Sequence, residues 1–193
     1  MEREILLTGI GGQGVQLAAQ VLARAAVGEG REVMLTGTYG GTMRGGSTDS
    51  CLVVADEPIR TPPIVSRAWA VVAMHDRFFA PSGEKLQPGS LVFTNSDLFE
   101  GEVEAEGVHV LGVSASRVAS QVATSMASCL VLASAFAGAT RFVSLDSLVS
   151  AMTECVPSYR RQHLEANESA LRAGFDLVGD PAEPAWPGEA SAA

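Results

Sequence analysis

The sequence has little cysteine, and the spacing of its cysteines excludes a self-contained metal centre. The three cysteines, Cys51, Cys129 and Cys155, are odd in number, lie far apart and form no C-x-x-C pair. A zinc or iron–sulfur site built on thiolates needs a set of ligands closer together than these. We therefore expect buried, reduced thiols of a cytoplasmic protein and no metal bound by this chain.

Positive charge is also scarce. Lysine and arginine number 13 against 22 acidic residues, which gives a net charge of −9. Nucleic acids and anionic membranes both recognise basic patches, so the sequence argues against partners of these classes. The longest weakly polar stretch, 118–140, contains Gln121 and several Ser and Thr residues, which indicates a buried helix rather than a membrane span. The N-terminal MEREILL enters a strand pattern at once, so no signal peptide is expected.

Aromatic residues are few, at 6%, whereas hydrophobic residues make up 47% and glycine is abundant. This composition predicts a full-sized core in which helices pack closely through small side chains. Hydrophobic patterning predicts an α/β fold, a Rossmann-like three-layer sandwich with a mostly parallel sheet, over residues 1–178. Its first strand, helix and second strand are expected to form a right-handed βαβ unit. The expected strands are 3–9, 32–39, 50–56, 68–74, 89–95 and 107–113.

Helices are expected after the first strand and after the last one. The first helix follows the opening glycine loop and ends at Gly28. A long helix is predicted over 116–138, capped by Ser114 or Ser116. Shorter helices are predicted over 144–152 and about 158–174. Residues 179–193 are rich in Pro, Ala and acid, which favours a disordered tail or one that wraps a partner, with Trp186 left open as a docking residue.

A glycine-rich turn follows the first strand and has the spacing G-x-G-x-x-G. Candidate ligand-binding residues here are Gly9, Gly11, Gly12, Gln13 and Gly14. Backbone N–H groups and the helix dipole favour an anion at such a helix start. The turn lacks the Lys-Ser or Lys-Thr pair of a Walker loop, and no acid follows the second strand to hold a ribose. Gln13 would point at a ligand, so dinucleotide binding is only one reading of this turn.

A second glycine-dense loop leaves the second strand at the same edge of the predicted sheet. Open parallel sheets bind ligands at that edge, which makes this loop a functional candidate or an interface. Arg44 would present a guanidinium to a phosphate, a carboxylate or a partner's acid, although pairing with a surface acid is the simpler alternative. The candidate residues of this loop are Tyr39, Arg44, Gly45, Gly46 and Ser47.

His75 and Asp76 are weak candidates for acid–base chemistry. They follow the fourth predicted strand at the same edge, and histidine changes charge near neutral pH. Adjacent strand residues point to opposite faces, and Asp76 in a turn could simply start a helix. A structural role is therefore favoured, and no catalytic residue is expected in this chain.

Taken together, the two loops resemble a known family. The stretches GIGGQGVQLAAQVLARAA and TYGGTMRGGSTDSCLVV are similar to the gamma subunit, or gamma domain, of 2-oxoacid:ferredoxin oxidoreductases. That family includes pyruvate, 2-oxoglutarate, ketoisovalerate (branched-chain) and indolepyruvate enzymes. The resemblance extends over about residues 3–178, while departures at Trp69, Ser128 and Cys129 leave the 2-oxoacid undetermined.

The resemblance implies an oxidative decarboxylation of a 2-oxoacid to acyl-CoA and CO2 with reduction of ferredoxin. Thiamine diphosphate, Mg²⁺ and 4Fe–4S clusters would then belong to alpha and beta subunits, with a delta subunit left open. This chain would be mainly structural, inactive alone, and would help to shape the approach of coenzyme A, its co-substrate. Two other readings stay open: a stand-alone NAD(P)- or flavin-dependent reductase of Rossmann type, and a regulatory module that binds a small anion.

Overall fold

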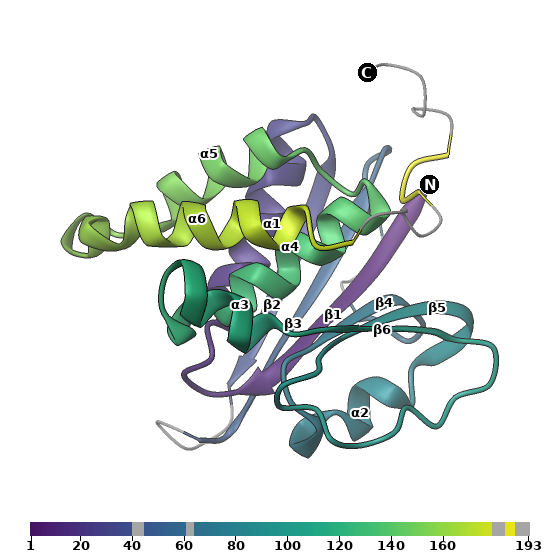
Figure 1. Cartoon of the computed structure of the whole chain (residues 1–193). Coiled ribbons are helices and arrows are strands. Elements are labelled where there is room, and N and C mark those ends of the chain that lie inside the picture. Colours follow the sequence, from purple (N-terminus) through teal and green to yellow (C-terminus); the bar gives the residue numbers. More distant parts are fainter. Residues whose placement is uncertain (40–44, 61–63, 179–183, 188–193) are drawn as a thin grey trace.

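A six-stranded sheet forms the centre of the computed structural model, which describes residues 1–39, 45–60, 64–178 and 184–187 (Figure 1). The strand order is β2-β3-β1-β4-β5-β6. The strands nearly all carry apolar residues on both faces, as expected for a sheet covered on both sides. Their bounds are β1 Glu2–Ile10, β2 Glu32–Tyr39, β3 Ser47–Ala55, β4 Ala68–Ala73, β5 Leu86–Asn95 and β6 His109–Val113.

The sheet is mixed because β3 runs antiparallel to both of its neighbours, β1 and β2. The strands β1, β4, β5 and β6 are parallel, so the predicted α/β fold with a mostly parallel sheet is confirmed. The expected βαβ unit differs in one respect: β1 and β2 run in the same direction but do not pair. The chain between Tyr39 and Ser47 is too short for a crossover, so β3 returns as the antiparallel neighbour of β2 and separates it from β1.

Two apolar clusters lie on the two sides of the sheet. The larger lies under the long helices, α1 Val15–Gly28, α3 Ala115–Val122, α4 Ser128–Thr140, α5 Leu145–Cys155 and α6 Leu164–Phe175. The smaller one contains Leu6, Val71, Val92 and Phe79, below the 3₁₀ turn η1 Asp76–Phe78 and the short helix α2 Ala80–Gly83. Neighbouring strand residues alternate between the two clusters, which fixes the register of each strand.

Close contact between α4 and α6 depends on small residues. Ser134 donates a hydrogen bond to the carbonyl of Leu171, and Gly138 faces the carbonyl of Phe175, where a Cβ would stand at 2.5 Å. Gly174 faces the backbone of Val131 in the same way. The helix α4 is buried almost throughout, between the sheet and α6. The predicted close packing of helices through small side chains is thus seen at these positions.

The single long helix predicted over 116–138 is wrong. The chain forms α3, breaks at Ala123 and Thr124, makes the 3₁₀ turn η2 Ser125–Ala127 and then begins α4. Thr124 is extended and its side chain accepts a hydrogen bond from the N–H of Met126, so it caps η2 instead of continuing a helix. The predicted last helix is also divided, into the 3₁₀ segment η3 Ser158–His163 and α6.

Part of the tail packs on the rest of the chain. Trp186 is only 6% exposed and its indole N–H donates to the carbonyl of Phe142 at 2.9 Å. The prediction of a disordered or partner-wrapping tail otherwise concerns 179–183 and 188–193, which lie outside the described residues. Among the described helices, none is long and apolar enough to cross a membrane.

Candidate functional site

The first glycine loop lies at the carboxyl end of β1, where the chain turns into α1. The N–H of Gln13 donates to the carbonyl of Ile10 at 3.0 Å, which closes the turn. Gly12 and Gly14 have φ angles of 108° and 87°, values that residues with a side chain rarely adopt. Gly14 is the N-cap of α1, and no side chain caps this helix. The loop therefore leaves the start of α1 without a side-chain cap.

The second glycine loop joins the first through its main chain. The N–H of Gly11 donates to the carbonyl of Gly46 at 2.8 Å, and the N–H of Gly45 approaches the carbonyl of Gly11 at 3.4 Å. A Cβ on Gly11 would stand 3.4 Å from the hydroxyl of Thr48. Small residues on both loops thus permit their backbones to meet. We call the surface formed by Gly11–Gly14, Gly45 and Gly46 the glycine edge.

A set of polar groups beneath the glycine edge holds the strands in place. The carboxylate of Asp49 accepts hydrogen bonds from the hydroxyls of Thr8 and Ser47, both at 2.6 Å. Gln16, on the first turn of α1, donates to the carbonyl of Asp49 at 2.9 Å and covers Gly37. Sequence reasoning missed Thr8, Gln16 and Asp49. Only the antiparallel pairing of β1 with β3, which sets Thr8 opposite Asp49, brings them together.

Gln13 differs from the expectation that it faces a ligand. Its amide oxygen accepts a hydrogen bond from the N–H of Ile10 at 2.7 Å. The same oxygen lies where a Cβ on Gly9 would be, at 2.7 Å. The side chain of Gln13 therefore stabilises the loop from within. Position 9 requires glycine because the Gln13 amide oxygen fills the space where a Cβ would lie.

The break between α3 and α4 lies against the glycine edge. A Cβ on Gly14 would stand 3.8 Å from the carbonyl of Met126 and from the Cβ of Cys129. The side chain of Met126 is 76% exposed, and Val122 is also exposed. Cys129 is buried, and burial raises the pKa of its thiol to about 12, as for a cysteine with a structural role. The exposed backbone of the glycine edge is thus bordered by the segment that carries the exposed Met126.

The structure describes only some of the remaining candidate residues of the second loop. The backbone of Tyr39 ends β2 opposite Thr48, while Ser47 begins β3 and binds Asp49. The side chain of Tyr39 and the whole of Arg44 lie outside the described residues, so the predicted role of Arg44 stays a prediction.

His75 and Asp76 follow β4 at the same edge of the sheet, and their side chains meet. The Nδ1 atom of His75 lies 2.7 Å from a carboxylate oxygen of Asp76. The second oxygen of Asp76 accepts hydrogen bonds from the N–H groups of Glu100 and Gly101, at 3.3 and 3.0 Å. Burial raises the pKa of the Asp76 carboxyl, but the bond and charge of His75 and these N–H groups outweigh it, so the net pKa is lowered. The arrangement ties the 100–101 turn to β4.

An Asp76→Asn variant is expected to lose about 1–2 kcal/mol of stability at pH 7, because the hydrogen bonds from two backbone N–H groups lose their charged acceptor and the bond to His75 loses its carboxylate. The pKa of Asp76 is lowered on folding, so this stabilisation is complete above the ordinary carboxyl pKa. It disappears as the pH falls through the folded-state pKa. Urea unfolding at pH 7 and at pH 3 measures both effects. The exposed Glu104→Gln variant is the control, and equal stability of Asp76→Asn and wild type at pH 7 would contradict the assignment.

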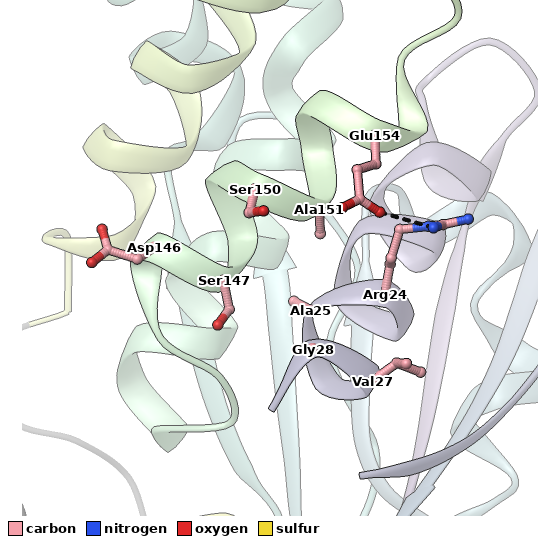
Figure 2. Close-up of a pocket in the computed structure, with 9 residues that line it drawn as sticks. All are labelled: Arg24, Ala25, Val27, Gly28, Asp146, Ser147, Ser150, Ala151 and Glu154. Carbon is pink, nitrogen blue, oxygen red and sulfur yellow. Dashed lines mark hydrogen bonds and ion pairs between the residues drawn. The ribbon is translucent and has the colours of Figure 1, made fainter. Parts of the chain in front are cut away.

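Two surface hollows lie away from the glycine edge, toward the other end of α1. One of about 420 Å³ lies between α1 and α5 and is lined by residues such as Ser147 and Ser150 (Figure 2). The other, of about 540 Å³, lies between α1, β2 and the end of α5. An ion pair at 2.9 Å between Arg24 and Glu154 borders both. Within the described residues no three His, Cys, Asp or Glu side chains gather as they would around a metal ion.

Comparison with known proteins identifies the family to which this chain belongs. The family model for pyruvate ferredoxin/flavodoxin oxidoreductase matches residues 4–177, which covers both glycine loops and all of the sheet except the first two residues of β1. The chain belongs to this family. The 2-oxoglutarate synthase subunit KorC of Methanocaldococcus jannaschii is 29% identical over 92% of this chain and 95% of its own length. The corresponding KorC of Methanothermobacter marburgensis is 30% identical over 92% of this chain and 97% of its own.

Solved structures of this oxidoreductase family have the same fold. The gamma subunit of a keto/oxoacid ferredoxin oxidoreductase from Geobacter sulfurreducens superposes with a TM-score of 0.75 and 24% identity, covering 90% of this chain and 96% of that chain. A 2-oxoglutarate:ferredoxin oxidoreductase from Magnetococcus marinus gives a TM-score of 0.81 and 18% identity over 95% of this chain and 33% of that longer chain. The predicted resemblance to the gamma subunit, or gamma domain, is confirmed, and the relatives are subunits of oxidoreductases.

Proposed function

We propose that this chain serves as the gamma subunit of a multi-subunit enzyme that converts a 2-oxoacid and coenzyme A into acyl-CoA and CO2 and passes the electron pair to ferredoxin. The observation that carries the proposal is the match along nearly the whole chain to 2-oxoglutarate synthase subunits of similar length. Pyruvate synthase subunit PorC of Methanothermobacter thermautotrophicus is 28% identical over 91% of this chain, so the 2-oxoacid stays open between these types.

The cofactors of this reaction would belong to partner subunits. There, thiamine diphosphate with Mg²⁺ would supply the decarboxylation chemistry, and 4Fe–4S clusters would accept electrons singly. The thiols of the present chain are far apart and buried or half-buried, and burial raises the pKa of Cys51 and of Cys155. Such thiols suit a packed subunit, so we assign this chain no redox step.

The glycine edge would be the surface through which this chain contacts a partner subunit and coenzyme A. A Cβ on Gly12 would meet no atom within 4 Å, so a large group can approach the backbone of this residue directly. The start of α1 lies beside it, where the helix dipole favours a negative charge such as a coenzyme A phosphate. Met126 adds an exposed apolar side chain to the same surface. A junction with a partner subunit that borders coenzyme A would use both features.

Two other functions make different predictions about ligands. A stand-alone NAD(P)- or flavin-dependent reductase needs a group that holds the ribose after β2, but that strand ends in Gly37, Thr38 and Tyr39. A regulatory module would bind a small anion and have no partner. Thermal-shift titrations of the isolated chain with NADP, NAD, FAD, coenzyme A and phosphate discriminate them, because a ligand that binds the folded state raises Tm. A clear shift with NADP or FAD and none with coenzyme A would favour the reductase.

The direct test is anaerobic purification of the tagged chain from its own host, followed by identification of the chains that accompany it. We expect stoichiometric partner chains together with iron, sulfide and thiamine diphosphate. Recovery of the chain alone, or as a homodimer without these groups, would overturn the gamma-subunit proposal.

A further inference from the structure

The described part of the C-terminal tail, 184–187, lies outside the stretch matched by the family model and reaches back to the opposite end of the sheet from the glycine edge. Figure 1 shows it in yellow beside the N-terminus. Its sequence is Pro-Ala-Trp-Pro. Ala185 is fully buried and Trp186 nearly so, although the tail is otherwise polar and proline-rich. Burial of this kind in a tail requires a dedicated receiving surface.

The surface recognises the backbone of the segment on both sides of Ala185. The N–H of Ala185 donates to the carbonyl of Thr140 at 2.7 Å, at the end of α4. The carbonyl of Ala185 accepts from the Nε–H of Arg3 at 2.8 Å, at the start of β1. Both main-chain groups of one residue are therefore satisfied by distant parts of the chain, as when a domain binds an extended peptide.

The surface also contacts the ring and the N–H group of the Trp186 indole. The ring of Phe142 stacks on it at a centroid distance of 6.0 Å and an interplanar angle of 27°. The guanidinium of Arg31 lies 4.1 Å from the indole centroid, a cation–π contact. The indole N–H donates to the carbonyl of Phe142. A phenyl ring could stack here but could not donate this bond, so the hydrogen bond to Phe142 favours indole over phenyl.

We propose that the pocket formed by Arg3, Arg31, Thr140 and Phe142 is a binding site for a tryptophan-bearing, proline-flanked peptide segment, and that this chain fills it with its own tail. The two prolines restrict the free segment, which lowers the entropy lost when it docks. The pocket joins the start of β1, the turn after α1 and the end of α4. The docked segment therefore holds together elements that are far apart in the sequence.

The test uses a Trp186→Ala variant of the full chain, which empties the indole position. We expect its Tm to fall by roughly 10 °C, since a large buried aromatic group is lost. Millimolar indole should then raise the Tm of the variant by roughly 3 °C and leave wild type unchanged, because the wild-type pocket is already filled. A blocked Pro-Ala-Trp-Pro peptide should stabilise the variant as well, and its Trp→Ala counterpart should not. If indole and the peptide shift the variant no more than they shift wild type, the binding site is disproved.

A second measurement covers the case in which Trp186→Ala does not fold. The chain has two tryptophans, so a Trp69→Phe variant leaves Trp186 as the sole indole fluorophore and keeps an aromatic ring against Arg3 and Phe142, which Trp69 contacts. We expect its fluorescence to be several-fold less sensitive to acrylamide than that of the free tail peptide. Replacing Arg31 with Met in that background should increase the sensitivity. Quenching of the folded variant equal to that of the peptide would show that the tail does not dock, and would overturn the proposal.

Discussion

A Gly174→Val variant is expected to lose at least about 3 kcal/mol of folding free energy, or to fail to fold. The Cβ of any larger residue at this position would overlap the carbonyl oxygen of Val131 and stand 2.9 Å from its Cα. These are backbone atoms of a buried helix, so they cannot move aside as the end of a flexible side chain could. The helices α4 and α6 would have to separate, which would also break the Ser134 hydrogen bond to Leu171. Urea unfolding followed by circular dichroism measures the loss.

Gly28→Ala is the matched control for this prediction. Gly28 also lies in a helix, but it is exposed and a Cβ there meets no atom within 4 Å. Alanine is the better helix former, so this variant should equal wild type or exceed its stability by up to about 1 kcal/mol. If Gly174→Val were as stable as Gly28→Ala, the close packing of α4 on α6 would be disproved.

A Gly11→Val variant is expected to lower the 2-oxoacid-dependent activity of the assembled enzyme by about tenfold to a hundredfold, while the chain itself stays folded. This prediction rests on the proposed function. At Gly11 a Cβ would already touch the hydroxyl of Thr48 and the main chain of Gly45 and Gly46, at 3.4–3.5 Å. The extra methyl groups of valine would push the second loop away. A displacement of about 1 Å beside a reacting substrate can cost this much in rate.

The readouts for Gly11→Val are the activity of the purified complex, its KM for coenzyme A and the Tm of the isolated chain. We expect the Tm to change little, because the loops lie at the surface and only the two main-chain hydrogen bonds between them are lost. Gly28→Ala again serves as the control, since that residue lies at the other end of α1. Full activity with an unchanged KM for coenzyme A would show that the geometry of the glycine edge is not used in the reaction.

The sequence predicted the strands and the loops well because hydrophobic runs and glycines are local signals. Gly9, Gly11 and Gly14 marked the turn after β1 correctly: a Cβ on Gly9 would overlap its neighbours, and Gly14 has a positive φ. The antiparallel position of β3 was not predicted, because pairing depends on where a strand returns and not on its composition. The groups brought together by that pairing, such as Thr8 and Asp49, were missed for the same reason.

The division of the predicted long helix had a weak local signal. Thr124 and Ser125 favour caps and turns, but the surrounding alanines and apolar residues indicate a continuous helix. The packing of η2 against Gly14 and α6 favours the broken helix over the continuous one. Such contacts join residues far apart in the sequence, so a local pattern cannot predict them. The docking of Trp186 was left open for a similar reason, because its partners Arg31 and Phe142 are distant in the sequence.

The decisive measurement is the reduction of ferredoxin by the complex purified through this chain, assayed anaerobically with 2-oxoglutarate and with pyruvate. We expect reduction that requires one of these 2-oxoacids and coenzyme A, that produces the acyl-CoA, and that falls when this chain is removed and returns when it is added back. Ferredoxin reduction by the remaining subunits at the full rate, or reduction with NADPH in place of the 2-oxoacid, would contradict the role of this chain as a gamma subunit.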